Sequence, residues 1–212
     1  MAASSIRGLR IFQIVLWTLV VVLGAYIVLP SVLPRSGPPG VDVTPPEARL
    51  GPDVAMNAPF QLVTHEGKPV TEKDFAGKPG AWFYGFTNCP DICPTALAEM
   101  TQLLADLGAD GGKLNAVFVT VDPERDTAEI LKTYMGYFDP RIIGLTGDLP
   151  AITEMAKSRF VQFAKLPQGE TYAMQHPAGF FLVDAEGNFA GTLDPEESLE
   201  VKLGKLKKLI GA

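Results

Sequence analysis

Cysteine and histidine are scarce in this chain, which has only two of each among its 212 residues. Two cysteines are too few for the small folds that several disulfides hold together. Any site built on thiols or imidazoles is therefore restricted to Cys89, Cys93, His65 and His176. The rest of the composition is that of a globular protein, with 47% hydrophobic and 20% charged residues.

Acidic residues are absent before Asp42, and residues 11–29 carry no charge of either sign. At about 1.5 Å per residue, this apolar run is long enough to cross a bilayer as a helix. Arg7 and Arg10 precede it, so residues 1–10 are expected to stay in the cytoplasm. We therefore predict a single N-terminal transmembrane helix, with the rest of the chain beyond the membrane.

A cleaved signal peptide is the alternative to an anchor. The run is longer than a typical signal-peptide core, and no clear Ala-x-Ala site closes it, so we favour the anchor. Both alternatives export the rest of the chain. The expected location is the periplasmic side of the inner (cytoplasmic) membrane, or the equivalent side of the mitochondrial inner membrane in a eukaryote.

Basic residues do not outnumber acidic ones in the exported part. From Asp42 onward, 15 basic residues stand against 24 acidic ones, a formal charge of −9. This excess of negative charge argues against nucleic acid as a partner.

Proline and glycine interrupt residues 30–59, which we interpret as an extended tether. Residues 60–212 then form one domain without internal repeats. Apolar patterns predict strands at 60–63, 69–70, 81–86, 114–121, 141–145, 180–183 and 189–193, and an extended segment at 161–166. Helices are predicted at 94–107, 126–137, 149–159 and 195–210. This alternation indicates an α/β layered fold, and the cysteine pair after the first core strand favours a thioredoxin-like one.

The two cysteines lie between a buried strand and a helix, which is a common place for disulfide chemistry or soft-metal binding. Pro94 fits the first helical position, so Cys93 is expected at the helix N-terminus with a lowered thiol pKa. Thioredoxin-type oxidoreductases have two residues between their cysteines, whereas Cys89 and Cys93 have three. The longer loop leaves room for one ion between two sulfurs and does not forbid a disulfide. A purely structural disulfide is disfavoured, since so short a loop constrains the unfolded chain little.

A third ligand is needed because two thiolates rarely complete a specific transition-metal site. His176 lies in a loop before the apolar strand 180–183. In a thioredoxin-like sheet, this loop should return over the cysteine turn. Two sulfurs and one imidazole favour copper, as Cu(I) or Cu(II). His65 is expected to be an exposed turn residue, and Met174 to serve packing rather than ligation.

Three aspartates lie near the expected site. Asp91, inside the cysteine loop, is expected to structure that loop or cap the helix. Asp122 follows the second core strand, at the edge of the sheet where functional loops gather. Asp126 or Thr127 could cap the next helix, and we expect capping to be the role of Asp126.

Several motifs together resemble the Sco family of copper-binding, membrane-anchored assembly factors for cytochrome c oxidase. They are residues 84–95 (YGFTNCPDICPT), 119–127 (VTVDPERDT), 144–147 (GLTG) and the histidine before 180–184 (FFLVD). The resemblance covers about residues 55–209. It implies a thioredoxin-like fold with an added hairpin, and Cys89, Cys93 and His176 as the copper ligands. It also implies a copper-site subunit of the oxidase as partner, together with an unidentified copper donor.

One departure from the family pattern lies beside the histidine. Members often have an acidic residue before it and a small hydroxyl residue after it, whereas this chain has Gln175 and Pro177. The three ligands remain, but the resemblance no longer predicts the copper affinity of the site or the mobility of the loop. Two alternatives to a copper chaperone also stay open: a thiol-disulfide reductase that keeps the oxidase subunit's cysteines reduced, and a peroxidase of the thioredoxin superfamily.

Overall fold

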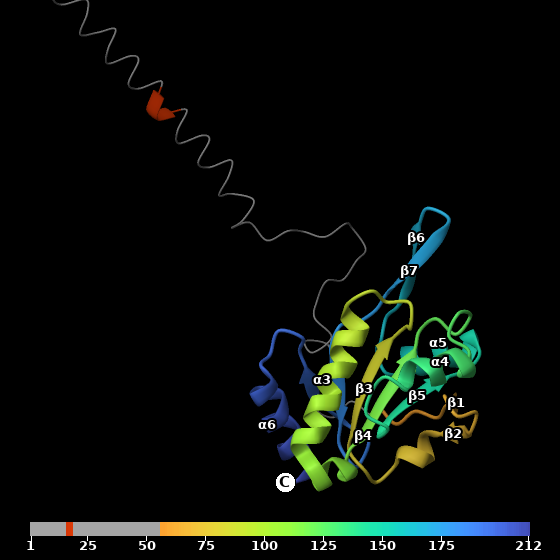
Figure 1. Cartoon of the computed structure of the whole chain (residues 1–212), viewed down its shortest axis with the longest axis vertical. Helices are drawn as coiled ribbons and strands as arrows, with labels where there is room; N and C mark the ends of the chain where they lie inside the picture. Colours follow the sequence, from red (N-terminus) through yellow and green to blue (C-terminus); the bar gives the residue numbers. More distant parts are fainter. Residues whose placement is uncertain (1–15, 19–55) are drawn as a thin grey trace, which may run out of the picture. The chain divides into compact units, whose positions relative to one another are not determined.

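The computed structural model of the chain describes residues 16–18 and 56–212, coloured by sequence in Figure 1. Residues 16–18 are helical and exposed. The rest of the predicted membrane anchor, and the predicted tether up to residue 55, lie outside the described residues. Within the described part of the chain, no helix is both long and apolar enough to cross a membrane.

A seven-stranded mixed sheet forms the centre of the domain, in the order β2-β1-β5-β4-β3-β8-β9. Its strands are β1 (Gln61–Thr64), β2 (Pro69–Thr71), β3 (Gly80–Gly85), β4 (Asn115–Thr120), β5 (Ile142–Thr146), β8 (Phe180–Val183) and β9 (Phe189–Leu193). The central strands β3, β4 and β5 run parallel, and the other pairs are antiparallel. Each of these strands overlaps one predicted from the apolar patterns.

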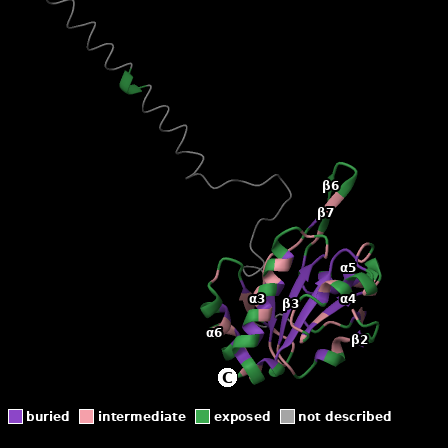
Figure 2. Cartoon of the chain, in the orientation of Figure 1, coloured by how far each residue is buried: buried purple, intermediate pink, exposed green. Residues whose placement is uncertain are grey.

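Strands β3 and β4 are buried along their whole length (Figure 2), as expected for central strands covered on both faces. They pair in register from Gly80 with Asn115 to Gly85 with Thr120. The loops that follow them therefore begin at the same edge of the sheet. That edge carries the cysteine loop and the loop that contains Asp122.

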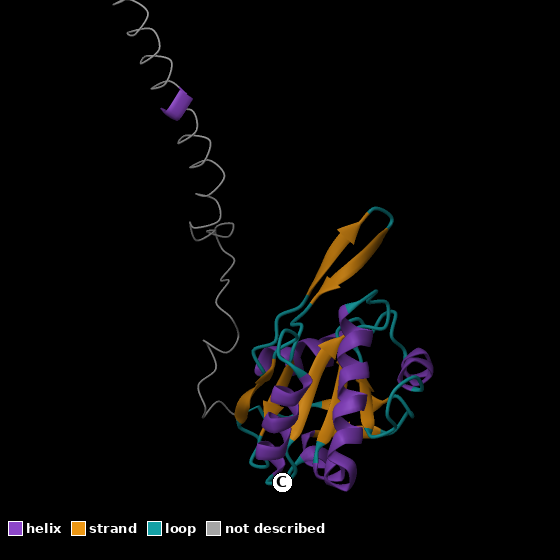
Figure 3. Cartoon of the chain, turned by 60° about the vertical axis from the view of Figure 1, so that its left-hand side comes forward, coloured by secondary structure: helices purple, strands orange, loops and turns teal. Residues whose placement is uncertain are grey.

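Helices lie on both faces of the sheet (Figure 3). They are α3 (Ile92–Leu107), α4 (Ala128–Met135), α5 (Leu149–Ser158) and α6 (Leu199–Ile210), with short 3-10 helices at Glu72–Phe75 and Gly108–Lys113. Helix α3 packs against α6, and α4 packs against β5. All four predicted helices are present, and the α/β fold is confirmed.

A separate two-stranded sheet, β6 (Ala164–Gln168) with β7 (Thr171–Gln175), projects from the main sheet (Figure 1). Gly169 turns the chain with a φ of 61°. Strand β6 overlaps the extended segment predicted at 161–166, whereas β7 occupies the first part of the segment 171–179, which was expected to be loop before β8. The hairpin is exposed over most of its surface, and β7 lacks the apolar alternation by which strands are recognised from sequence.

Two helix starts also differ from the prediction. Helix α3 begins at Ile92, so Pro94 is its third residue rather than its first, although a proline is still tolerated in the first turn. Helix α6 begins at Leu199, where the Ser198 side chain accepts a hydrogen bond from the Val201 N–H. The earlier start of α3 changes the position of Cys93 in the helix.

Candidate metal site

Cys89 and Cys93 lie on either side of the start of α3, after the end of β3. Cys93 is the second residue of the helix and has no exposed surface, whereas Cys89 is half-buried in the preceding loop. Both thiols are free. The pair therefore has one sulfur in the protein interior and one nearer the surface.

Gly85 allows the end of β3 to approach the sulfur of Cys93 closely. A Cβ atom at Gly85 would lie 2.8 Å from Cys93 Sγ and 3.0 Å from the ring of Phe118. Carbon atoms in ordinary van der Waals contact are about 3.5–4.0 Å apart, so any larger residue would have to displace these groups. The sequence contains this glycine within the matched motif but does not by itself indicate the close approach.

Asp126 anchors the start of the cysteine loop. Its carboxylate accepts hydrogen bonds from the Thr87 backbone N–H at 2.9 Å, the Thr87 hydroxyl at 2.6 Å and the Thr120 hydroxyl at 2.6 Å. The residue is fully buried. The expectation that Asp126 caps a helix is wrong, because Thr127 caps α4 by accepting the Ile130 N–H.

The N-terminus of α3 is directed at the sulfur of Cys89. The backbone N–H of Cys93 donates to Cys89 Sγ over 3.4 Å, and such a donor stabilises negative charge on its acceptor. Burial raises the pKa of the Cys93 thiol. The expected lowering of that pKa is therefore wrong, because the loss of hydration on burial outweighs the field of the helix end.

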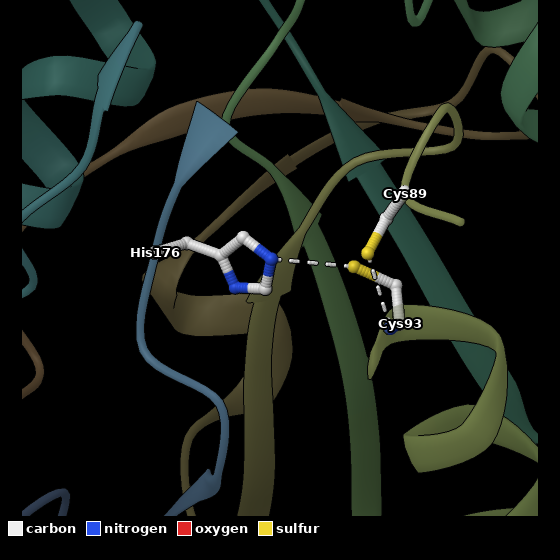
Figure 4. Close-up of side chains that lie close together, drawn as sticks. All are labelled: Cys89, Cys93 and His176. Carbon is white, nitrogen blue, oxygen red and sulfur yellow. Dashed lines mark hydrogen bonds between the residues drawn. The ribbon is translucent and has the colours of Figure 1, made fainter. Parts of the chain in front are cut away.

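His176 follows β7 and places its imidazole beside the sulfurs (Figure 4). Its Nε2 lies 3.4 Å from Cys93 Sγ, and the three possible ligand atoms of Cys89, Cys93 and His176 all lie within 4.8 Å of one another. The rings of Phe83 and Phe86 face the imidazole edge-on, with centroids 5.9 and 5.7 Å away. The structure thus brings together three residues that are up to 87 positions apart in the sequence.

The second nitrogen of His176 identifies the tautomer that suits a metal ligand. Nδ1 lies 2.8 Å from the carbonyl oxygen of Pro177, which can only accept, so Nδ1 carries the proton. The lone pair of Nε2 then points toward the cysteines. Metal-binding histidines show the same arrangement, in which the nitrogen that does not bind the metal donates its N–H to a carbonyl or carboxylate. Burial also lowers the pKa of His176, which favours the neutral imidazole.

The other sequence candidates lie elsewhere or serve the fold. His65 is half-buried rather than exposed, and its Nδ1 accepts the Gly144 N–H at 3.0 Å. Met174 is buried among the core residues, as expected. Asp91 is the residue before α3 but makes no side-chain capping bond, and the Thr95 hydroxyl lies 3.5 Å from its carboxylate.

The donor set of the cluster is two sulfurs and one imidazole nitrogen. Thiolate sulfur selects soft ions such as Cu(I), and imidazole accepts copper in either common oxidation state. Structural zinc sites, in contrast, are almost always completed by four protein ligands. Among the described residues, this cluster is the one group of at least three cysteine, histidine or acidic side chains that could hold an ion.

A model of the SCO1/SenC family matches residues 49–211 of the chain. The chain belongs to the SCO1/SenC family. Among curated relatives, the mitochondrial protein SCO2 of Saccharomyces cerevisiae is 36% identical over 163 residues, which cover 75% of this chain and 54% of that protein. The chain spans about half the length of the curated relatives it matches.

Solved Sco structures share the fold. ScoI of Bradyrhizobium japonicum, solved with copper bound, is 40% identical with a TM-score of 0.68, covering 72% of this chain and 98% of that one. BsSco, described as having a disulfide switch and as a member of the Sco family of cytochrome c oxidase assembly proteins, is 25% identical with a TM-score of 0.62, covering 76% and 97%. The thioredoxin-like character of the α/β fold is thereby confirmed.

Proposed function

We propose that this protein is a membrane-anchored copper chaperone that helps to assemble the dinuclear copper site of cytochrome c oxidase. One copper ion would be held by Cys89, Cys93 and His176. The observation that carries the proposal is the convergence of two sulfurs and an imidazole nitrogen within 4.8 Å, in a chain whose relative was solved with copper bound. An oxidase subunit would receive the ion.

Binding requires the buried thiol to lose its proton. Burial keeps Cys93 protonated in the metal-free protein by raising its pKa, so an incoming cation replaces a proton at that sulfur. Cys89, nearer the surface, is the ligand that a partner can reach first. Release would follow the same route in reverse, with the partner's ligands replacing those of the chaperone one at a time.

The anchor and tether would give this site its working position. We assign residues 11–29 to a membrane span, 30–59 to a tether and 60–212 to the copper-binding domain. The domain would face the periplasm, or the equivalent space in mitochondria; several of the curated relatives are named as mitochondrial proteins. A tethered domain can search the neighbourhood of a membrane-bound partner without diffusing away.

A copper titration of the reduced full-length protein in detergent tests this proposal. Anaerobic competition for Cu(I) with a chromophoric chelator should give one tightly bound ion per chain. His176→Ala should weaken binding markedly, whereas His65→Ala, which also removes an imidazole, should keep the wild-type affinity. Absence of stoichiometric binding, or equal affinities for wild type and His176→Ala, would overturn the proposal.

A thiol-disulfide reductase is the second candidate, favoured by two free, neighbouring thiols and by the disulfide switch described for BsSco. In this reaction Cys89 and Cys93 would form a disulfide, and their two electrons and two protons would reduce a disulfide of the oxidase subunit to two thiols. Incubation of the metal-free reduced protein with an oxidised peptide carrying the subunit's cysteines separates the two functions. Stoichiometric reduction that persists in His176→Ala would support the reductase.

A further inference from the structure

A polar cluster outside the three-residue site joins the loop after β4 to the exposed hairpin. It consists of Asp122, Arg125 and Tyr172. Asp122 and Arg125 follow β4, while Tyr172 lies in β7, four residues before His176. The cluster therefore holds the strand that delivers the histidine.

Side chains and one backbone carbonyl make the contacts within the cluster. Arg125 donates from Nε to the Asp122 carboxylate and from Nη1 to the Tyr172 carbonyl oxygen at 3.1 Å. The Tyr172 hydroxyl donates to the other oxygen of Asp122 at 2.8 Å. The guanidinium carbon of Arg125 also lies 3.8 Å from the centre of the Tyr172 ring, within cation–π range. Arg125 thus contacts the backbone and the ring of Tyr172, and Asp122 contacts its hydroxyl.

The hairpin needs such contacts because it is not a part of the main sheet. Strands β6 and β7 hydrogen-bond to each other in a sheet of their own. Backbone pairing therefore fixes the two strands relative to one another but not relative to β3 and β4. The side chain of Asp122, in contrast, is fully buried at the edge of the main sheet and is a fixed point of attachment.

Arg125 also reaches the cysteine side of the site. Its guanidinium carbon lies 5.8 Å from the centre of the Phe86 ring, and that ring faces the imidazole of His176 edge-on. Phe86 is three residues before Cys89, and its carbonyl accepts the Cys89 N–H at 3.3 Å. One side chain therefore contacts the histidine-bearing strand and the aromatic ring between the histidine and the cysteine loop.

We propose that Arg125, oriented by Asp122, is the positioning residue that sets His176 against the two sulfurs by holding Tyr172. The inference rests on the proposed function, in which His176 is the third copper ligand. We call the contacts of Asp122, Arg125 and Tyr172 the clamp. Without it, the sulfurs keep their places while the imidazole loses its fixed distance from them. The clamp thereby decides whether bound copper has the nitrogen ligand in addition to the two sulfurs.

Two variants test the clamp in the full-length protein. Arg125→Gln removes the guanidinium, and Tyr172→Phe removes the hydroxyl bond to Asp122 but keeps the ring and the backbone carbonyl. Lys113→Gln is the control, because it also removes a cation, one that forms an exposed ion pair with Asp110 and is not in contact with the cluster. Two quantities are measured: Cu(I) affinity by chelator competition, and nitrogen hyperfine coupling in the EPR spectrum of the Cu(II) form.

Arg125→Gln should lower the Cu(I) affinity about tenfold, at the lower end of the effect of outer-shell partners, and should weaken the nitrogen coupling. Tyr172→Phe should change both quantities in the same direction by less, and Lys113→Gln should change neither. Loss of stability alone would not alter the nitrogen coupling of the folded fraction. Should Arg125→Gln fail to fold, Tyr172→Phe alone decides by the same two readouts.

Two outcomes overturn the inference and can be told apart. Wild-type affinity and coupling in both clamp variants, together with a clear change in His176→Ala, would refute the clamp and leave the proposed function intact. Wild-type behaviour of His176→Ala itself would refute the third ligand, and the clamp with it.

Discussion

The two sides of the candidate site are built differently. The cysteine side belongs to the core: Cys93 is fully buried, Gly85 lets the strand touch its sulfur, and the buried Asp126 fixes the loop through Thr87. The histidine side lies where the exposed β6–β7 hairpin leads back into β8. The cysteine side belongs to the main sheet and its core, whereas the strand before His176 pairs in a separate sheet and is joined to the main one through side-chain contacts.

This difference divides the work of binding a metal. Close packing holds the Cys93 sulfur in place, and burial raises the pKa of its thiol, so an incoming cation would have to replace a proton there. The imidazole, whose pKa is lowered by burial, would add a ligand from an element that is not paired with the main sheet. Changes on the cysteine side should therefore affect both folding and binding, whereas changes on the histidine side should affect mainly binding.

The largest effect is expected from replacing Cys93 with serine. A serine hydroxyl is a hard donor that does not ionise at neutral pH, so one of the two soft ligands is lost. Cu(I) affinity, measured by chelator competition, should fall by more than the roughly 10–100-fold typical of outer-shell changes. An affinity within a factor of ten of wild type would contradict the assignment of Cys93 as a ligand.

Gly85→Ala should disturb both folding and binding. The added Cβ would meet Cys93 Sγ at 2.8 Å, and overpacking of this kind costs about 1–3 kcal/mol of unfolding free energy. Urea denaturation measures the loss of stability, and the chelator competition measures the effect on copper. Gly204→Ala in α6 is the control: nothing lies within 4 Å of its Cβ position, so this helical substitution should not destabilise the protein. Equal stability of the two variants would show that the strand does not press on the sulfur.

Asp126→Asn should loosen the cysteine loop with a smaller effect on copper than loss of a ligand. An amide in place of the carboxylate leaves a buried donor group facing the hydroxyls of Thr87 and Thr120, at a cost of about 1–3 kcal/mol. Asp148→Asn is the same change at an exposed helix cap, where asparagine serves as well as aspartate. Urea denaturation should therefore show a lower unfolding free energy for Asp126→Asn than for Asp148→Asn. Equal unfolding free energies would argue against the role of Asp126 in holding the cysteine loop.

The smallest effect is expected on the pH dependence of stability. The folded pKa of His176 is lowered, so the metal-free fold should lose stability as pH falls below the unfolded value of about 6.5. The folded pKa of Cys93 is raised, so its contribution to the unfolding free energy is present below about pH 8.5 and is lost as pH rises beyond that value.

Urea denaturation from below about pH 6.5 to above about pH 8.5 measures both losses of stability. His176→Gln should flatten only the acidic part of the profile and Cys93→Ala only the alkaline part; an unchanged profile in either variant would refute its part of the account.

Sequence patterns predicted much of the fold because the central elements are strongly apolar. The run at 81–86 and the helical spacing after it located the cysteine turn, which the structure places between β3 and α3. Long-range arrangements could not be predicted in the same way. Asp126 has its partner Thr87 39 positions away, and local sequence suggested a helix cap instead. The strand β7 was missed because its apolar residues are consecutive rather than alternating.

The prediction for the Cys93 thiol failed for a related reason. A cysteine near a proline and a helix start indicates the favourable field of a helix end, but its burial depends on β3, Phe118 and the rest of the core. Burial then decides the direction of the pKa shift. The position of His176 beside the sulfurs was predicted from topology and from the family resemblance, whereas the contacts of Arg125 with Tyr172 had no signal in the sequence.

The most direct test of the central claim is X-ray absorption spectroscopy of the full-length protein loaded with one equivalent of Cu(I). We expect the extended fine structure to fit two sulfur ligands and one imidazole nitrogen per copper, and the imidazole contribution to disappear in His176→Ala. A copper environment of sulfur ligands alone in the wild type, or an imidazole contribution that persists in His176→Ala, would contradict the claim that Cys89, Cys93 and His176 form one metal site.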